Sequence, residues 1–64
     1  MEYMKRARKR RHMTQAQLGQ LIGLSVSAIS LYETGRRKPP VDIAKLIASA
    51  LGFGWKRFYE DDDM

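Results

Sequence analysis

The chain has no cysteine among its 64 residues, which excludes a disulfide framework and a thiolate metal site. Its single histidine, His12, has no second cluster of metal-ligating residues beside it, so we expect no metal ion and no other cofactor. No apolar run approaches the roughly 20 residues that cross a bilayer, and charged residues follow Met1 where a signal peptide would be apolar. These absences predict a soluble, cytoplasmic protein without a membrane partner.

The sequence also lacks the patterns on which most enzymes depend. It contains no glycine-rich phosphate loop after a strand. It offers no carboxylate pair for a pocket, because its acidic residues cluster at 60–63. We therefore expect neither catalysis nor a small-molecule substrate.

A chain of 64 residues has room for one domain, near the size at which burial barely outweighs the entropy of ordering the backbone. We expect one folded domain over residues 1–59. Residues 60–64 have no apolar partner and are expected to form a disordered acidic tail.

The formal net charge of +5 is unevenly distributed along the chain. Residues 1–38 hold nine basic and two acidic residues, whereas residues 39–64 hold three basic and five acidic ones. Such a gradient would attract a polyanion and orient the chain on it. The alternative is a basic surface that only maintains solubility.

The first predicted helix covers about residues 2–11, which are rich in the helix formers Met, Lys, Arg and Ala. Met4 and Ala7 share its inner side. The helix is expected to end near His12, where an imidazole suits the carbonyl end of a helix. We therefore interpret His12 as a structural residue at a helix end.

Residues 14–35, TQAQLGQLIGLSVSAISLYETG, predict two short helices joined by a glycine turn. Thr14 is a suitable N-cap, and Gln17 three residues later completes a capping box. Gly23 ends the first of these helices because glycine adopts a left-handed backbone without strain. Ser25 caps the second helix. This order is typical of a helix-turn-helix.

The second helix of this motif has an uncharged outer side. Ile29, Tyr32 and Glu33 fall on its inner side when residues are placed at about 100° intervals. The side chains left facing outward are Val26, Ser27, Ser30, Leu31 and Thr34. Basic clusters flank this segment in the sequence, so the face is suited to a groove between negatively charged strands.

Residues 36–40, RRKPP, predict a stiff basic loop because proline restricts the backbone. A helix is expected over about residues 41–51, and a short last helix over about residues 55–59. The core side of the longer helix is predicted to hold Val41, Ala44, Ile47, Ala48 and Leu51. A second apolar stripe, formed by Ile43, Leu46 and Ala50, is either additional core or an interface. Trp55 and Phe58 of the short last helix are predicted to pack into the core as large apolar side chains.

With TQAQLGQLIG, LSVSAIS, YETGRRKP and IASALGF in this order, the chain resembles the phage repressor and Cro family of helix-turn-helix proteins over about residues 4–59. The resemblance implies an all-α, compact five-helix domain. It also implies that the second helix of the motif lies in the major groove of double-stranded DNA. The partner implied is therefore duplex DNA.

Carried over to this sequence, the resemblance assigns base contacts to Val26, Ser27, Ser30 and Leu31. Family members often have glutamine at the positions of Val26 and Leu31. Valine and leucine can contact only thymine methyl groups, and serine bonds donors and acceptors alike. We expect A·T-rich half-sites with modest base discrimination.

The resemblance assigns phosphate contacts to Gln15, Thr34, Arg36 and Lys38, with Arg37 able to alternate with its neighbours. It further matches Arg8 and Glu33 to an internal ion pair of the family. Gly19 departs from the family pattern, which usually has alanine where the two motif helices cross. The missing methyl permits a close approach and costs about 1 kcal/mol of helix propensity.

The leading hypothesis is a transcriptional regulator, most simply a repressor, that binds a pseudo-palindromic operator as a homodimer. Ile43, Leu46 and Trp55 are the candidate dimer interface. One alternative is an antitoxin or adaptor that binds a protein partner and uses DNA binding for autoregulation. Another is a membrane-surface helix at residues 5–11, which lacks the large apolar face that such helices need.

Overall fold

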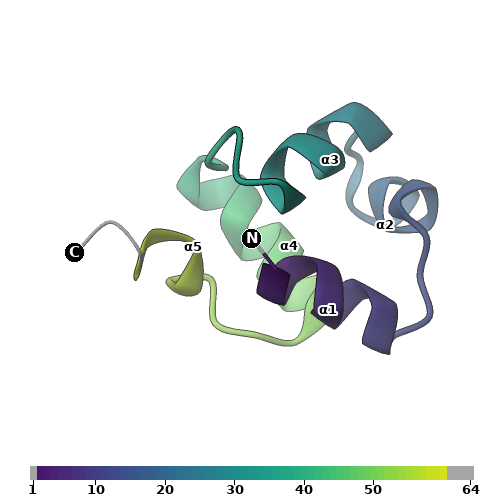
Figure 1. The fold of residues 1–64 in the computed structure, drawn as a ribbon, viewed down its shortest axis with the longest axis horizontal. Coiled ribbons are helices and arrows are strands. Elements are labelled where there is room, and N and C mark those ends of the chain that lie inside the picture. Colours follow the sequence, from purple (N-terminus) through teal and green to yellow (C-terminus); the bar gives the residue numbers. More distant parts are fainter. Residues whose placement is uncertain (1, 61–64) are drawn as a thin grey trace.

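The computed structural model describes residues 2–60, which form five helices and no strand. The predicted all-α, five-helix domain is confirmed. The elements in chain order are α1 (Glu2–Arg10), α2 (Gln15–Ile22), α3 (Val26–Glu33), α4 (Val41–Leu51) and α5 (Arg57–Glu60). Figure 1 shows α2 and α3 together at one end of the molecule and α5 at the other, with α1 lying across α4.

The end of α1 depends on a left-handed residue. His12 has a φ of 59°, and the amides of His12 and Met13 donate to the carbonyls of Lys9 and Arg8. These two bonds close the helix in a Schellman motif, which usually has glycine at the left-handed position. Beside it, Arg11 donates from Nε to the carbonyl of Leu51 at 3.0 Å and thereby joins α1 to the end of α4.

The caps of α2 and α3 follow the sequence prediction. The Thr14 hydroxyl accepts from the Gln17 amide at 3.0 Å, and the Gln17 side chain accepts from the Thr14 amide at 2.8 Å. Ser25 caps α3 by accepting from the amide of Ala28. A methyl group on Gly19 would collide with the carbonyl oxygen of Leu24, so the turn lies closer to α2 than an alanine permits.

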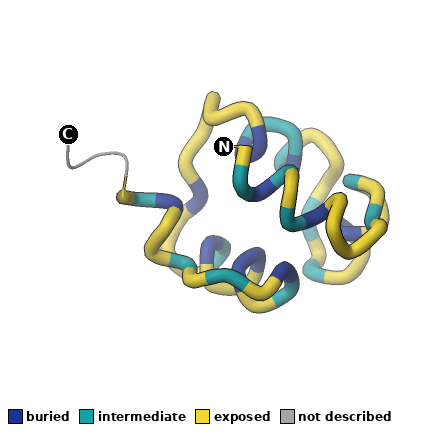
Figure 2. The backbone as a smooth tube through the Cα atoms, turned by 60° about the horizontal axis from the view of Figure 1, so that its bottom comes forward, coloured by how far each residue is buried: buried dark blue, intermediate teal, exposed yellow. Residues whose placement is uncertain are grey.

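The core lies where α1, α2, α3 and α4 meet, and α5 adds one aromatic side chain to it. The fully buried apolar side chains on the helices are Met4, Leu18, Ile29, Ala44, Ile47 and Phe58. Phe58 packs against Tyr3 and Phe53, with ring centroids 5.7 and 5.5 Å away. Figure 2 shows buried and exposed positions alternating along the helices, as expected for amphipathic segments around one core.

The second half of the chain corrects three expectations. Val41, predicted in the core, is 47% exposed, and the nearby residue buried in its place is Pro39. The last helix begins at Arg57, because Trp55 and Lys56 form a turn before it. Glu60, expected in the acidic tail, is the last residue of α5, and the remainder of that predicted tail lies outside the described residues.

The predicted second stripe on α4 is divided. Ile43 and Ala50 are half-buried against the core, whereas Leu46 is 48% exposed.

Within residues 2–60, no helix has the length and apolar character that a membrane span requires.

Candidate nucleic-acid interface

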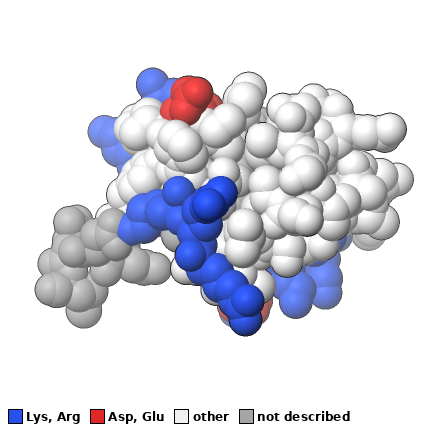
Figure 3. Space-filling view, turned by 90° about the horizontal axis from the view of Figure 1, so that it is seen from above, with Lys and Arg blue, Asp and Glu red and all other residues white. Residues whose placement is uncertain are grey.

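The outer side of α3 forms an uncharged surface, which we call the α3 face. Its members are Val26, Ser27, Ser30 and Leu31 of the helix and Thr34, the C-cap residue that follows it. Val26 is 46% exposed at the first position of the helix, and Ser30 and Leu31 are half-buried. In Figure 3, lysine and arginine side chains border an uncharged surface over α2 and α3. The arrangement offers small and apolar side chains in the middle and positive charge at the edge.

A buried ion pair between α1 and α3 fixes the position of the α3 face relative to α1. Arg8 Nε lies 2.6 Å from Glu33 Oε2, Arg8 Nη2 donates to Glu33 Oε1 at 3.2 Å, and both side chains are more than nine-tenths buried. The remaining guanidinium nitrogen donates to the Met13 carbonyl at 2.7 Å. Two-point binding of a carboxylate by arginine is geometrically specific, so the pair sets how α3 lies against α1.

Gln15, predicted to contact a phosphate, also belongs to this network. Its amide nitrogen Nε2 donates to Glu33 Oε1 at 3.0 Å. The side chain is half-buried, at the first position of α2. An amide nitrogen carries two hydrogens, so one remains for an acceptor outside the protein while the other stays on Glu33.

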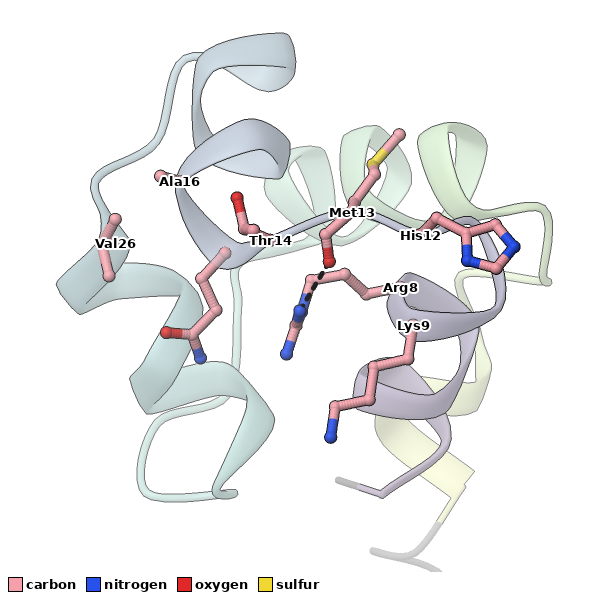
Figure 4. Close-up of a pocket in the computed structure, with 8 residues that line it drawn as sticks. Arg8, Lys9, His12, Met13, Thr14, Ala16 and Val26 are labelled. Atoms are coloured by element: carbon pink, nitrogen blue, oxygen red, sulfur yellow. Dashed lines mark hydrogen bonds between the residues drawn. The ribbon is translucent and has the colours of Figure 1, made fainter.

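A shallow hollow lies between the end of α1 and the starts of α2 and α3. Figure 4 shows Arg8 bonded to Met13 at its centre and Lys9, Thr14 and Val26 around it. The free amides of the first turn of α2 carry partial positive charge, and Lys9 adds a full one. The hollow is therefore suited to an anionic group beside the first residue of α3.

The loop after α3 leaves the helix through a second Schellman motif. Gly35 has a φ of 76°, and the amides of Gly35 and Arg36 donate to the carbonyls of Tyr32 and Leu31. The Thr34 hydroxyl donates to the Ser30 carbonyl at 2.9 Å, so this predicted phosphate ligand is turned toward its own helix. The Thr34 hydroxyl oxygen can still accept a hydrogen bond, but a phosphate oxygen is itself an acceptor and needs a donor.

The other two predicted phosphate ligands, Arg36 and Lys38, are exposed on this loop. Lys38 lies with Nζ 5.8 Å from the centre of the Tyr59 ring. The Tyr59 hydroxyl donates to the carbonyl of Pro39 at 2.6 Å. Burial, assisted by the negative charge of Asp42, raises the pKa of Tyr59 above its ordinary value of 10.0.

Comparison with known proteins agrees with this geometry. The profile of the helix-turn-helix family matches residues 4–56. The chain belongs to the helix-turn-helix family. It is similar to an uncharacterized HTH-type transcriptional regulator, YqaF, of Bacillus subtilis (strain 168), with 32% identity over 60 residues that cover 94% of this chain and 79% of that protein. No solved structure gives a significant match.

The helix-turn-helix motif of this DNA-binding regulator is formed by α2 and α3. The residues predicted as its dimer interface lie elsewhere, on α4 and the turn before α5. Leu46 is exposed and Ile43 is half-buried. Trp55 is half-buried, and the ammonium groups of Lys45 and Lys56 lie 5.1 and 5.9 Å from the centre of its ring.

Two contacts near the interface were not predicted from the sequence. The bond from Gln15 to Glu33 joins residues 18 positions apart, and that from Tyr59 to Pro39 joins residues 20 positions apart. A glutamine at a helix start and a tyrosine at a helix end are both common, so neither residue type indicates its partner. The proline pair at 39 and 40 did indicate a fixed loop.

Proposed function

We propose that this helix-turn-helix protein is a sequence-specific transcriptional repressor that binds a pseudo-palindromic, A·T-rich operator as a homodimer and blocks a promoter in the cytoplasm. The observation that carries the proposal is the α3 face. An exposed, uncharged helix surface bordered by basic side chains matches the major groove in shape and its edges in charge.

The chemistry of the α3 face supports A·T preference. Val26 and Leu31 have no hydrogen-bonding atoms in their side chains, so they recognise thymine by contact with its methyl group. Ser27 and Ser30 bond a donor or an acceptor and discriminate weakly. Discrimination by this face is therefore modest for each base pair, and the phosphate contacts supply much of the affinity.

Phosphate binding is assigned to two places on either side of α3. At one end are Lys9 and Gln15 around the hollow at the start of α2. At the other end are Arg36 and Lys38 on the loop, with Arg37 beside them. Thr34 contributes here only if its hydroxyl turns away from the Ser30 carbonyl, to which it now donates.

The small size of the module supports the proposed dimer. A few phosphate contacts per subunit give weak binding that falls steeply with salt, with a log–log slope near −0.9 per contact. Two linked modules bind far more tightly because the second contact becomes intramolecular. We assign the contact with the second copy to exposed Leu46 on α4. Ile43 on the same helix and Trp55 in the turn that follows it complete the assigned surface.

The test is selection of bound duplexes from a random pool with wild type, Val26→Gln and Leu31→Gln. Each glutamine should redirect preference toward adenine at one base pair of each half-site, because a side-chain amide bonds adenine at two points. Leu21→Gln is the matched control, since Leu21 is 60% exposed on α2 and has no assigned contact. Its selected sequence should equal that of wild type.

The phosphate assignment has a separate test. Arg36→Ala should weaken binding to all duplexes about equally and make the salt slope shallower by about one. Unchanged preferences in both glutamine variants would show that another surface reads the bases. Failure of wild type to bind any duplex at low salt would end the proposal.

A further inference from the structure

We propose that Tyr59, on α5 and away from the α3 face, is a positioning residue for DNA binding: it holds the loop that carries Arg36 and Lys38 where these side chains meet the phosphates. The inference rests on the proposed function for its effect on DNA. Its structural part, the anchoring of the loop, stands on the contacts of the free protein.

The first contact is between main chain and side chain. The Tyr59 hydroxyl donates to the Pro39 carbonyl at 2.6 Å across 20 residues of sequence. Pro39 is fully buried, and its ring fixes its own φ. The loop is therefore held at its far end by Pro39 and Tyr59, and at its near end by the bonds of the Arg36 and Arg37 amides to the Leu31 carbonyl.

The second contact acts on a side chain that the proposed function uses. Lys38 lies with Nζ 5.8 Å from the centre of the Tyr59 ring, within the range of a cation–π interaction. The ring and the hydroxyl of one residue thus reach two consecutive residues of the loop. This arrangement restricts the positions of the Lys38 ammonium group and leaves its positive charge intact.

The Tyr59 ring is itself held in place by its neighbours Trp55 and Phe58. Its ring meets Trp55 edge to face, with centroids 6.1 Å apart, and Phe58, the residue before it, is fully buried in the core. The anchor is therefore built on the core through α5. A hydroxyl on a supported ring loses little entropy when it binds the loop, so the bond favours one loop position.

The test uses Tyr59→Phe, which removes one oxygen and keeps the ring. Tyr3→Phe is the matched control, because the Tyr3 ring contacts Phe53 and Phe58, whereas the Tyr59 ring contacts Trp55. The first measurement is the backbone 15N heteronuclear NOE of Arg36, Arg37 and Lys38 in the free protein. We expect lower values in Tyr59→Phe alone, with the amides of α1 to α4 unchanged.

The second measurement is the dissociation constant for DNA as a function of salt, at a temperature where circular dichroism shows both variants fully folded. We expect Tyr59→Phe to weaken specific and non-specific binding alike by about 3- to 10-fold, the equivalent of one lost hydrogen bond. The salt slope should become shallower while the preferred base sequence stays the same.

The outcomes separate the two proposals. Unaltered loop NOEs and unaltered affinity in Tyr59→Phe would overturn the positioning role, as would an equal loss in Tyr3→Phe. If wild type binds no duplex, the proposed function fails and the role in DNA binding falls with it, while the NOEs still decide whether Tyr59 orders the loop. Altered NOEs with unaltered affinity would also overturn the role in DNA binding.

Discussion

Arg8 and Glu33 lie 25 residues apart in the sequence, yet Arg8 Nε and Glu33 Oε2 are 2.6 Å apart in the structure, on side chains that are 8% and 3% exposed. The pair joins the first helix to the end of the helix proposed to read DNA. Since Gln15 donates to the same carboxylate, Glu33 organises all three elements around the hollow at the start of α2.

Arg8→Ala is expected to unfold the domain. It leaves the buried carboxylate of Glu33 without its cation, at a cost of about 3 to 5 kcal/mol. A domain of 64 residues has only about 3 to 10 kcal/mol of stability in total. Lys9→Ala, at an exposed position one residue later, is the control and should shift the unfolding free energy by less than about 0.5 kcal/mol. Urea denaturation followed by circular dichroism measures both, and equal stabilities would contradict the architectural role.

Thr14→Ala should lower the unfolding free energy by about 1 kcal/mol, because it removes the hydroxyl that accepts from the Gln17 amide. Thr14→Ser keeps that hydroxyl and should restore most of the loss. Thermal unfolding of the three proteins gives the comparison. If the alanine and serine variants have the same midpoint, the cap contributes nothing to α2.

Tyr59 should make the stability sensitive to alkaline pH. Its pKa in the folded protein is raised, through burial first and the charge of Asp42 second, so folding favours the neutral phenol. The resulting stabilisation is fully present below the ordinary pKa of about 10 and is lost as the pH rises through the higher folded value. The difference in unfolding free energy between wild type and Tyr59→Phe should therefore shrink as the pH is raised above about 10. A constant difference would mean that Tyr59 does not titrate differently on folding.

Leu46→Glu is expected to prevent dimerisation while leaving the fold intact, because Leu46 is 48% exposed. Loss of the second copy should reduce affinity for a two-half-site operator on the order of 100-fold, with little change for a single half-site. Leu21→Glu places the same charge on another exposed leucine and should affect neither. Sedimentation velocity and DNA titration provide the two measurements. Equal behaviour of both variants would place the dimer contact elsewhere.

Local signals predicted the helix boundaries well. Thr14, Gly23 and Ser25 act through bonds to residues a few positions away, and each of these bonds is present in the structure. The close of α1 near His12 was also anticipated, although its left-handed backbone was not; that backbone is uncommon outside glycine, and histidine is one of the residue types that adopt it more often than others. Capping is local, so a sequence contains most of the information that determines it.

Tertiary details were harder to predict, for a physical reason. Val41 shares a helical stripe with Ala44 and Ala48, but periodicity gives only the angle of a side chain around its helix. It does not tell whether another element covers that end of the helix, and for Val41 none covers it fully. Arg11 on the Leu51 carbonyl is likewise fixed by how α1 crosses α4, which no local pattern contains.

The side chains proposed to recognise DNA and the side chains that hold the fold are different ones in this molecule. Val26 and Ser27 stand in solvent at the start of α3, whereas Ile29, Tyr32 and Glu33 hold the same helix in place. The chain is consequently a convenient scaffold for engineering: a library randomised at positions 26 and 27 would sample new operator preferences from a common, unperturbed framework.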